Sequence, residues 1–194
     1  MKSQIRHAVY ETNSSSTHAI CITKRSTKNR VIPNHIDFCI GEYGWEFKEY
    51  KDTYNKASYL ITAILSFEKK YADEKMEQLK SILEVKGITY TFPELNIKSW
   101  QWNGKTKYFY DIDGYIDHPE ELKPLIDELL SDSDKLFRYL FDNSILITGN
   151  DNDDEYKERM CVSEGEEVTD WGTYVIYGDR KPEFDKYDIY EKRN

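Results

Sequence analysis

Strand-like and helix-like segments are grouped along this chain, and their order restricts the fold more than any other feature of the sequence. Two pairs of helix-like segments are preceded, separated and followed by short apolar or aromatic runs that are typical of strands. Grouping of this kind predicts an α+β fold. We therefore expect a mostly antiparallel β-sheet with about four helices packed against it.

The helices are predicted from apolar residues that recur at a period of three to four positions. The first begins after Asp52 or Thr53, which are good N-caps, and the second begins at Asp73 and ends at Gly87. Ser133 is the expected cap of the last helix. The four helices are expected over residues 54–70, 73–87, 119–130 and 133–141.

The strands are predicted from short apolar or aromatic runs bounded by turn residues. Asn103-Gly104 accepts the positive φ angles of a type I′ turn, so the runs on its two sides predict a hairpin. Residues 149–170 are acidic and are expected to form loops. The whole chain, residues 1–194, is expected to be one domain, with residues 179–194 as a flexible or docking tail. Strands are expected at residues 5–10, 18–23, 35–40, 88–92, 97–102, 106–112, 144–148 and 173–177.

The distribution of charge indicates which partners are favoured. The net charge is −9, but residues 1–36 carry +5 and the remainder carries −14. An acidic surface repels phosphate backbones, so no direct binding of nucleic acid is expected. It favours a basic protein partner, although acidity of this size is also common in soluble proteins without such a partner.

The same composition bears on the cellular compartment. Three cysteines make no disulfide framework, and the N-terminus has no apolar signal core. No apolar run approaches the length of a membrane span, so we expect a cytoplasmic protein that does not enter a membrane.

Residues 10–18, Tyr-Glu-Thr-Asn-Ser-Ser-Ser-Thr-His, concentrate hydroxyl groups between two strand-like runs. The segment is interpreted either as a capped polar turn or as a pocket in which hydroxyls and nearby cations bind an anion. A nucleophilic hydroxyl activated by the imidazole is a third alternative, although no orienting acid is identified. The ligand-binding candidates are Arg6, Ser14, Ser15, Ser16, Thr17 and His18.

Two further patterns suggest metal ligands, each with an ordinary structural alternative. Three carboxylates and an imidazole fall within eight residues, which suits a divalent cation but also an ordinary turn. His18-x2-Cys21 and His35-x3-Cys39 have ligand types that zinc prefers, but strand geometry would scatter them to opposite faces. No metal or other cofactor is therefore assigned. The carboxylate candidates are Asp111, Asp113, Asp117 and His118.

Several phrases of the chain resemble an uncharacterised family of small proteins of Firmicutes and their phages. They are the Tyr-Glu-Thr-Asn-Ser-Ser-Ser-Thr-His motif, Gly41-Glu-Tyr-Gly-Trp45 followed by Lys56-Ala-Ser-Tyr-Leu60, Tyr115-Ile-Asp-His118, and the run 143–152. The likeness spans roughly residues 5–152. It implies a bacterial cytosol and a phage or mobile-element origin, and it carries no catalytic residue over to this chain.

Two functional hypotheses follow. The first is a protein that binds a host protein, such as an inhibitor of a basic nucleic-acid-handling defence protein or CRISPR nuclease, and is not an enzyme. The second is an enzyme or an anion- or nucleotide-binding protein that uses residues 12–18, with or without a divalent metal. Under the first, an aromatic cluster and an acidic cluster would contact the partner, although Trp45 could equally close the core. The partner-binding candidates are Tyr43, Trp45, Tyr50, Asp151, Asp153 and Asp154.

Overall fold

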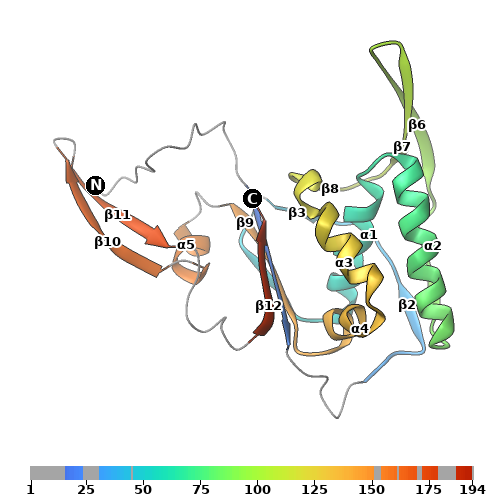
Figure 1. The fold of residues 1–194 in the computed structure, drawn as a ribbon, viewed down its shortest axis with the longest axis horizontal. Helices are drawn as coiled ribbons and strands as arrows, with labels where there is room; N and C mark the ends of the chain where they lie inside the picture. The colour runs from blue at the N-terminus through green and yellow to red at the C-terminus, as the bar shows by residue number, and fades with distance from the viewer. Residues whose placement is uncertain are drawn as a thin grey trace.

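A computed structural model of the chain describes residues 16–23, 31–44, 46–150, 154–160, 162–169, 172–178 and 187–193. These residues form an α+β fold, which confirms the predicted class (Figure 1). The helices are α1 (Thr53–Leu65), α2 (Lys69–Val85), α3 (Lys123–Ser131), α4 (Ser133–Phe141) and α5 (Asp154–Met160), with a 3₁₀ turn over Pro119–Leu122. The strands are β1 (Ser16–Thr23), β2 (His35–Asp37), β3 (Glu42–Tyr43), β4 (Lys48–Tyr50), β5 (Thr89–Thr91), β6 (Asn96–Trp102), β7 (Lys105–Asp111), β8 (Tyr115–Ile116), β9 (Ile145–Asn150), β10 (Val162–Thr169), β11 (Gly172–Gly178) and β12 (Tyr187–Arg193).

Strands from both ends of the chain meet in one four-stranded sheet with the order β12-β1-β9-β4. Every neighbouring pair in this sheet is antiparallel. The central strands β1 and β9 are buried on both faces: Ile20 and Leu146 belong to the main core, whereas Ala19 and Ile147 belong to a second cluster. Burial on both faces explains why these strands have continuous apolar runs rather than alternating ones.

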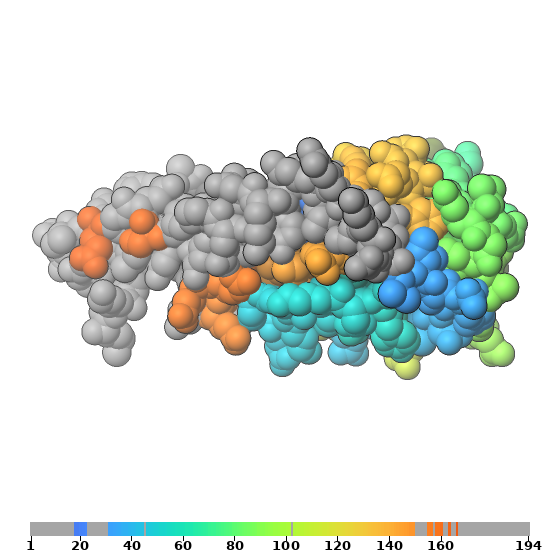
Figure 2. All heavy atoms as spheres, turned by 90° about the horizontal axis from the view of Figure 1, so that it is seen from below, coloured from blue at the N-terminus to red at the C-terminus, as the bar shows by residue number. Residues whose placement is uncertain are grey.

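The helices lie on both sides of this sheet. Helices α1, α3 and α4 lie on one side of it, and α5 lies on the other (Figure 1). In the space-filling view, α5 in orange adjoins the cyan residues that follow β3 (Figure 2). The expectation of loops over residues 149–170 was therefore wrong. Tyr156 and Met160, four residues apart on α5, are fully buried against the sheet and give this acidic segment an apolar anchor.

Helix α1 is buried along most of its length. Asp52, one of the two predicted candidates, is its N-cap, because its side chain accepts a hydrogen bond from the backbone N–H of Asn55 at 2.9 Å. All ten residues from Lys56 to Leu65 are buried. Lys56 is among them, and its Nζ donates to two backbone carbonyls between α4 and β9 at 3.2 and 3.3 Å. Burial lowers the pKa of Lys56 to about 8.

The ends of the next helices differ from the predicted ones. Helix α1 stops at Leu65 rather than at residue 70, since Glu68 forms an isolated antiparallel bridge with Phe109 of β7. Helix α2 then begins at Lys69, and Asp73 lies inside it, where its carboxylate accepts a hydrogen bond from the Tyr110 hydroxyl at 2.5 Å. The cap of α4 is Asp132 and not Ser133, while Gly87, with φ +71°, follows α2 as predicted.

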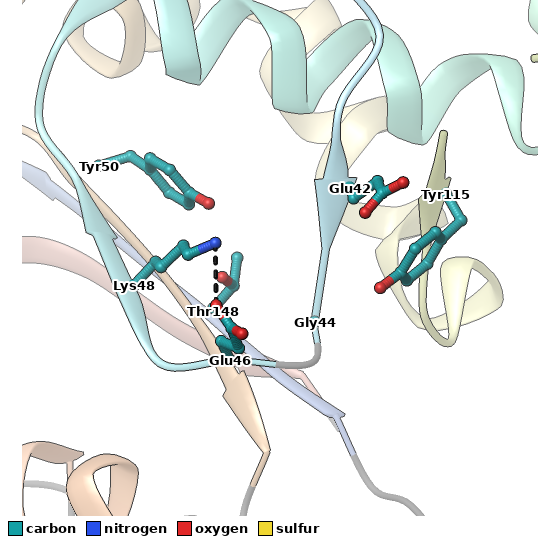
Figure 3. Close-up of a pocket in the computed structure, with 7 residues that line it drawn as sticks. All are labelled: Glu42, Gly44, Glu46, Lys48, Tyr50, Tyr115 and Thr148. Atoms are coloured by element: carbon teal, nitrogen blue, oxygen red, sulfur yellow. Dashed lines mark ion pairs between the residues drawn. The ribbon is translucent and has the colours of Figure 1, made fainter. Parts of the chain in front are cut away.

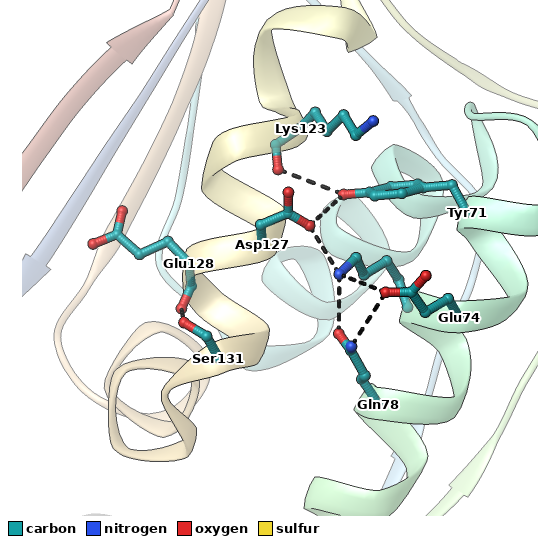
Figure 4. A network of polar contacts seen from close by, with 8 residues as sticks. Tyr71, Glu74, Gln78, Lys123, Asp127, Glu128 and Ser131 are labelled. Atoms are coloured by element: carbon teal, nitrogen blue, oxygen red, sulfur yellow. Dashed lines mark hydrogen bonds and ion pairs between the residues drawn. The ribbon is translucent and has the colours of Figure 1, made fainter.

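A polar network joins α2 to α3 (Figure 4). Lys75, almost fully buried, lies 2.9 Å from the Asp127 carboxylate and donates to the Gln78 side chain at 3.2 Å. The Tyr71 hydroxyl donates to the same Asp127 carboxylate at 3.0 Å. Because each buried polar group has a partner, the two helices can pack closely at little desolvation cost. The network fixes α3 against α2.

Four small two-stranded sheets complete the fold. Strands β2 and β5 pair in parallel, as do β3 and β8, whereas β10 and β11 form an antiparallel hairpin. The β6–β7 hairpin was predicted correctly: Asn103 and Gly104 have φ angles of +48° and +72°, which suit a type I′ turn. It extends away from the helices at one end of the molecule (Figure 1).

Candidate functional site

The hydroxyl-rich segment is only partly described by the structure. Arg6, Ser14 and Ser15 lie outside the described residues, as do Trp45, Asp151 and Asp153, and Asp154 is the first residue of α5. The described end of the segment is not a loop, because β1 starts at Ser16 and pairs with β9 from that residue on. Ser16, Thr17 and His18 therefore belong to a strand in the main sheet.

His18 is a buried, neutral side chain. It is 1 % exposed, and its Nε2 donates to the backbone carbonyl of Asp117 at 3.0 Å. A carbonyl only accepts, so the proton lies on Nε2, and among the described residues Nδ1 has no hydrogen-bond partner. Burial lowers the pKa of His18 to about 4. The ring packs against Tyr59 at a centroid distance of 5.7 Å. The imidazole is thus shielded from solvent and uncharged near pH 7.

The sheet places His18 in one row with two other polar residues. His18 pairs with Thr148 of β9, and Thr148 pairs on its other side with Lys48 of β4. Residues directly opposite one another in neighbouring strands project from the same face. Thr148 and Lys48 line a pocket of about 170 Å³, so His18 lies on the face that bears this pocket, beside Thr148. We call this cavity the polar pocket.

The polar pocket is lined mainly by hydroxyls and charged groups (Figure 3). Lys48 Nζ is 3.1 Å from the Glu46 carboxylate, and this contact raises the pKa of Lys48. The Tyr50 and Thr148 hydroxyls both line the pocket, and partial burial raises the pKa of Tyr50. The pocket can therefore hold a small polar molecule by several hydrogen bonds. Its lining residues are Glu42, Gly44, Glu46, Lys48, Tyr50, Tyr115 and Thr148.

Tyr43, one member of the aromatic cluster that was expected to contact a partner, belongs to the interior. Tyr43 is only 5 % exposed, and its ring contacts Tyr50 and Tyr59 edge-on at centroid distances of 5.6 and 5.1 Å. Burial raises the pKa of Tyr43 well above its usual value. Tyr43 is therefore a core residue rather than an interface residue, and Tyr50 is half-buried at the polar pocket.

The candidate metal ligands do not converge on one point. Asp111 ends β7 and pairs with Lys98 at 3.1 Å, while the Asp117 carboxylate accepts a hydrogen bond from the backbone N–H of His118 at 3.1 Å. Within the described ranges, no group of three or more His, Cys, Asp and Glu side chains is placed to hold a metal ion, Asp113 included. His18 and Cys21 face opposite sides of β1, as expected for two residues three positions apart in a strand. These two predicted zinc ligands therefore do not point to the same site.

The largest exposed apolar side chains of the described surface include three on the β6–β7 hairpin. Ile97, Trp100 and Tyr108 are 57, 65 and 53 % exposed. Sequence reasoning identified this hairpin but not its exposure. The signal was available, because both strands carry polar and aromatic residues on both faces, and a strand that packs on a core has one apolar face.

The register of the hairpin divides its side chains between two faces. Lys98 is opposite Phe109 and Trp100 is opposite Lys107, so these four residues project from one face. Ser99 is opposite Tyr108, and Ile97 lies on that second face as well. We call the first the Trp100 face and the second the Tyr108 face. Lys105, two residues from Lys107, adds a third lysine to the Trp100 face.

Comparison with protein-family models, with curated proteins and with solved structures found no match to this chain. Among the helices of the described residues, none is long and apolar enough to cross a membrane.

Proposed function

We propose that this protein acts by binding another protein, and that the β6–β7 hairpin makes the central contact. The observation that carries the proposal is the exposure of Ile97, Trp100 and Tyr108 on an element that projects from the body. Tryptophan and tyrosine dominate interface energetics when a partner covers them. A hairpin that served only to close the core would bury these side chains.

We propose further that the partner is a host nucleic-acid-handling protein and that this protein is of phage or mobile-element origin. The support is the net charge of −9, which suits a partner with a basic groove. The resemblance to phage-associated proteins of Firmicutes supports the same origin.

Affinity capture from nuclease-treated bacterial lysate tests the proposal. The wild type is compared with a Trp100→Ala/Tyr108→Ala variant and with a Tyr54→Ala/Val85→Ala control, which removes two exposed apolar side chains elsewhere. We expect a protein recovered with the wild type and the control and reduced at least tenfold with the hairpin variant, since two hot-spot side chains contribute about 2 kcal/mol or more. Equal recovery by all three would exclude the hairpin as the contact.

A second candidate function is binding of a small polar molecule in the polar pocket. The supporting observation is the row of His18, Thr148 and Lys48, which brings the predicted His18 next to a hydroxyl-lined cavity. Mass spectrometry of small molecules released from the purified protein tests it. A Lys48→Ala/Thr148→Val variant is expected to lose a molecule that the wild type and a Lys51→Ala control retain.

A further inference from the structure

The two long edges of the β6–β7 hairpin differ. The outer edge of β7 is engaged at Phe109, where Glu68 forms a bridge, and Glu68 also makes an ion pair with Lys107. In the described part of the chain, β6 has only β7 as a neighbour. In an antiparallel pair every second residue directs its backbone groups away from the partner strand. The outer edge of β6 therefore presents N–H and C=O groups to which another strand can bind.

We propose that the outer edge of β6 binds an extended segment of the protein partner by strand addition, and that this segment alternates acidic and apolar residues. The inference rests on the proposed function and specifies how the hairpin is used. Strand addition supplies affinity through backbone hydrogen bonds and specificity through side chains on alternating faces.

The alternation follows from the two faces of the hairpin. On the Trp100 face, an added strand would lie beside Lys98, so an acidic side chain is favoured there, where it would share Lys98 with Asp111. Lys107 lies one strand further away and is already paired with Glu68. On the Tyr108 face, the added strand would lie beside Ile97, so apolar side chains are favoured. The hairpin segment 96–111 has three lysines and one aspartate, in a chain whose net charge is −9.

The Trp100 face also has room for a large side chain near its base. A hollow of about 270 Å³ lies there, and its lining includes Lys98, Trp100 and Phe109 of the hairpin together with Leu65 and Ile112. An added strand that runs toward the body would end beside this hollow. Because the hollow lies on the Trp100 face, a partner strand bound at the outer edge of β6 could place a large side chain in it and cover Trp100.

Charge also favours an acidic strand at the outer edge of β6 over two alternatives, a second copy of this chain and a nucleic acid. A second copy of the chain paired through β6 would bring two sets of Lys98, Lys105 and Lys107 onto one continuous face, which like-charge repulsion disfavours. A nucleic acid would be attracted by these lysines but repelled by the acidic remainder of the chain. An acidic strand does not place a second set of lysines on the face, and it presents only a few carboxylates, rather than a continuous phosphate backbone, to the acidic remainder of the chain.

Proline substitution separates strand addition from other uses of the hairpin. The two-residue turn closes with the Trp102–Lys105 pair, so Ser99 and Thr106 occupy pairs whose N–H groups point outward. Ser99→Pro removes an outward N–H from β6 and leaves the β6–β7 ladder intact. Thr106→Pro does the same on β7 and is the matched control. Circular dichroism and the amide spectrum verify that both variants keep the hairpin.

The probe is the peptide Val-Glu-Val-Glu-Val-Glu-Val with blocked ends, added to the full-length protein labelled with ¹⁵N. We expect amide signals of Ile97, Ser99 and Gln101 to shift, and the affinity to fall at least tenfold with Ser99→Pro but less than twofold with Thr106→Pro. The analogous Val-Lys peptide should cause no shifts. High salt should weaken binding of the acidic peptide.

Three results would overturn strand addition: no shift in β6 with the acidic peptide, equal loss in both proline variants, or shifts caused by a single-stranded oligonucleotide instead. Concentration-dependent shifts in β6 without any peptide would also overturn it, because they would indicate pairing between copies of the chain. If the peptide fails while the Trp100→Ala/Tyr108→Ala variant still loses the captured protein, the proposed function stands and only this inference fails.

Discussion

The burial of His18 predicts that the protein loses stability in mild acid through this one side chain. The pKa of His18 is about 4 in the folded protein and 6.5 as the ordinary value. Above pH 6.5 both states are neutral, and this group adds no pH dependence. As the pH falls from 6.5 toward 4, the unfolded chain takes up a proton that the folded protein excludes, so the free energy of unfolding falls.

The magnitude follows from this pKa difference of about 2.5 units, which corresponds to about 3 kcal/mol for the full shift. Between pH 7 and pH 5 the loss is about 2 kcal/mol, because most of the unfolded imidazole is already protonated at pH 5. With a denaturant slope of about 2 kcal/mol per molar urea, the midpoint should move down by about 1 M.

Urea unfolding at pH 7 and pH 5 measures the effect in three proteins. His18→Gln keeps a donor for the Asp117 carbonyl but does not titrate, so it should lose most of the 1 M difference, although its midpoint at pH 7 is lower. His35→Gln removes an exposed histidine and should keep the wild-type difference. The reasoning is refuted if wild type and His18→Gln show the same difference, or if the ring signal of His18 in an NMR titration shows protonation near pH 6.5.

Three other changes should have local and measurable effects. Between pH 8 and 9.5 the wild type should gain about 2 kcal/mol of stability relative to Lys56→Met, because over that range the unfolded Lys56 holds a proton that the folded one has begun to release. Asp52→Ala should lower the free energy of unfolding by about 1 kcal/mol in a urea titration, since it removes the N-cap of α1. Gly104→Val should accelerate amide hydrogen exchange in β6 and β7 and leave the global urea midpoint almost unchanged, because φ at this position is +72° and the hairpin projects from the core.

The candidate site was harder to predict than the elements that form it. The sequence identified His18 and Tyr50, but it could not indicate that His18 is buried beside Thr148, which is 130 positions away and joins it only through the β1–β9 register. The hydroxyl-rich motif suggested a loop, whereas pairing with β9 extends β1 back to Ser16. Exposure of the hairpin was indicated by the polar and aromatic residues on both of its faces, but that β6 has no second neighbour among the described strands depends on the tertiary structure.

Local chemistry determined much of this protein from the sequence alone. The Asn103-Gly104 turn and the apolar period of α1 each act within a few residues and were confirmed, and of the two candidate caps of α1 the structure has Asp52. The tertiary structure decided what depends on distant partners. It buried Tyr43 in the core, formed α5 where an acidic loop was expected, and placed β12, from the end of the chain, beside β1. The physical reason is that burial and strand pairing are set by contacts between segments far apart in sequence, which no local pattern specifies.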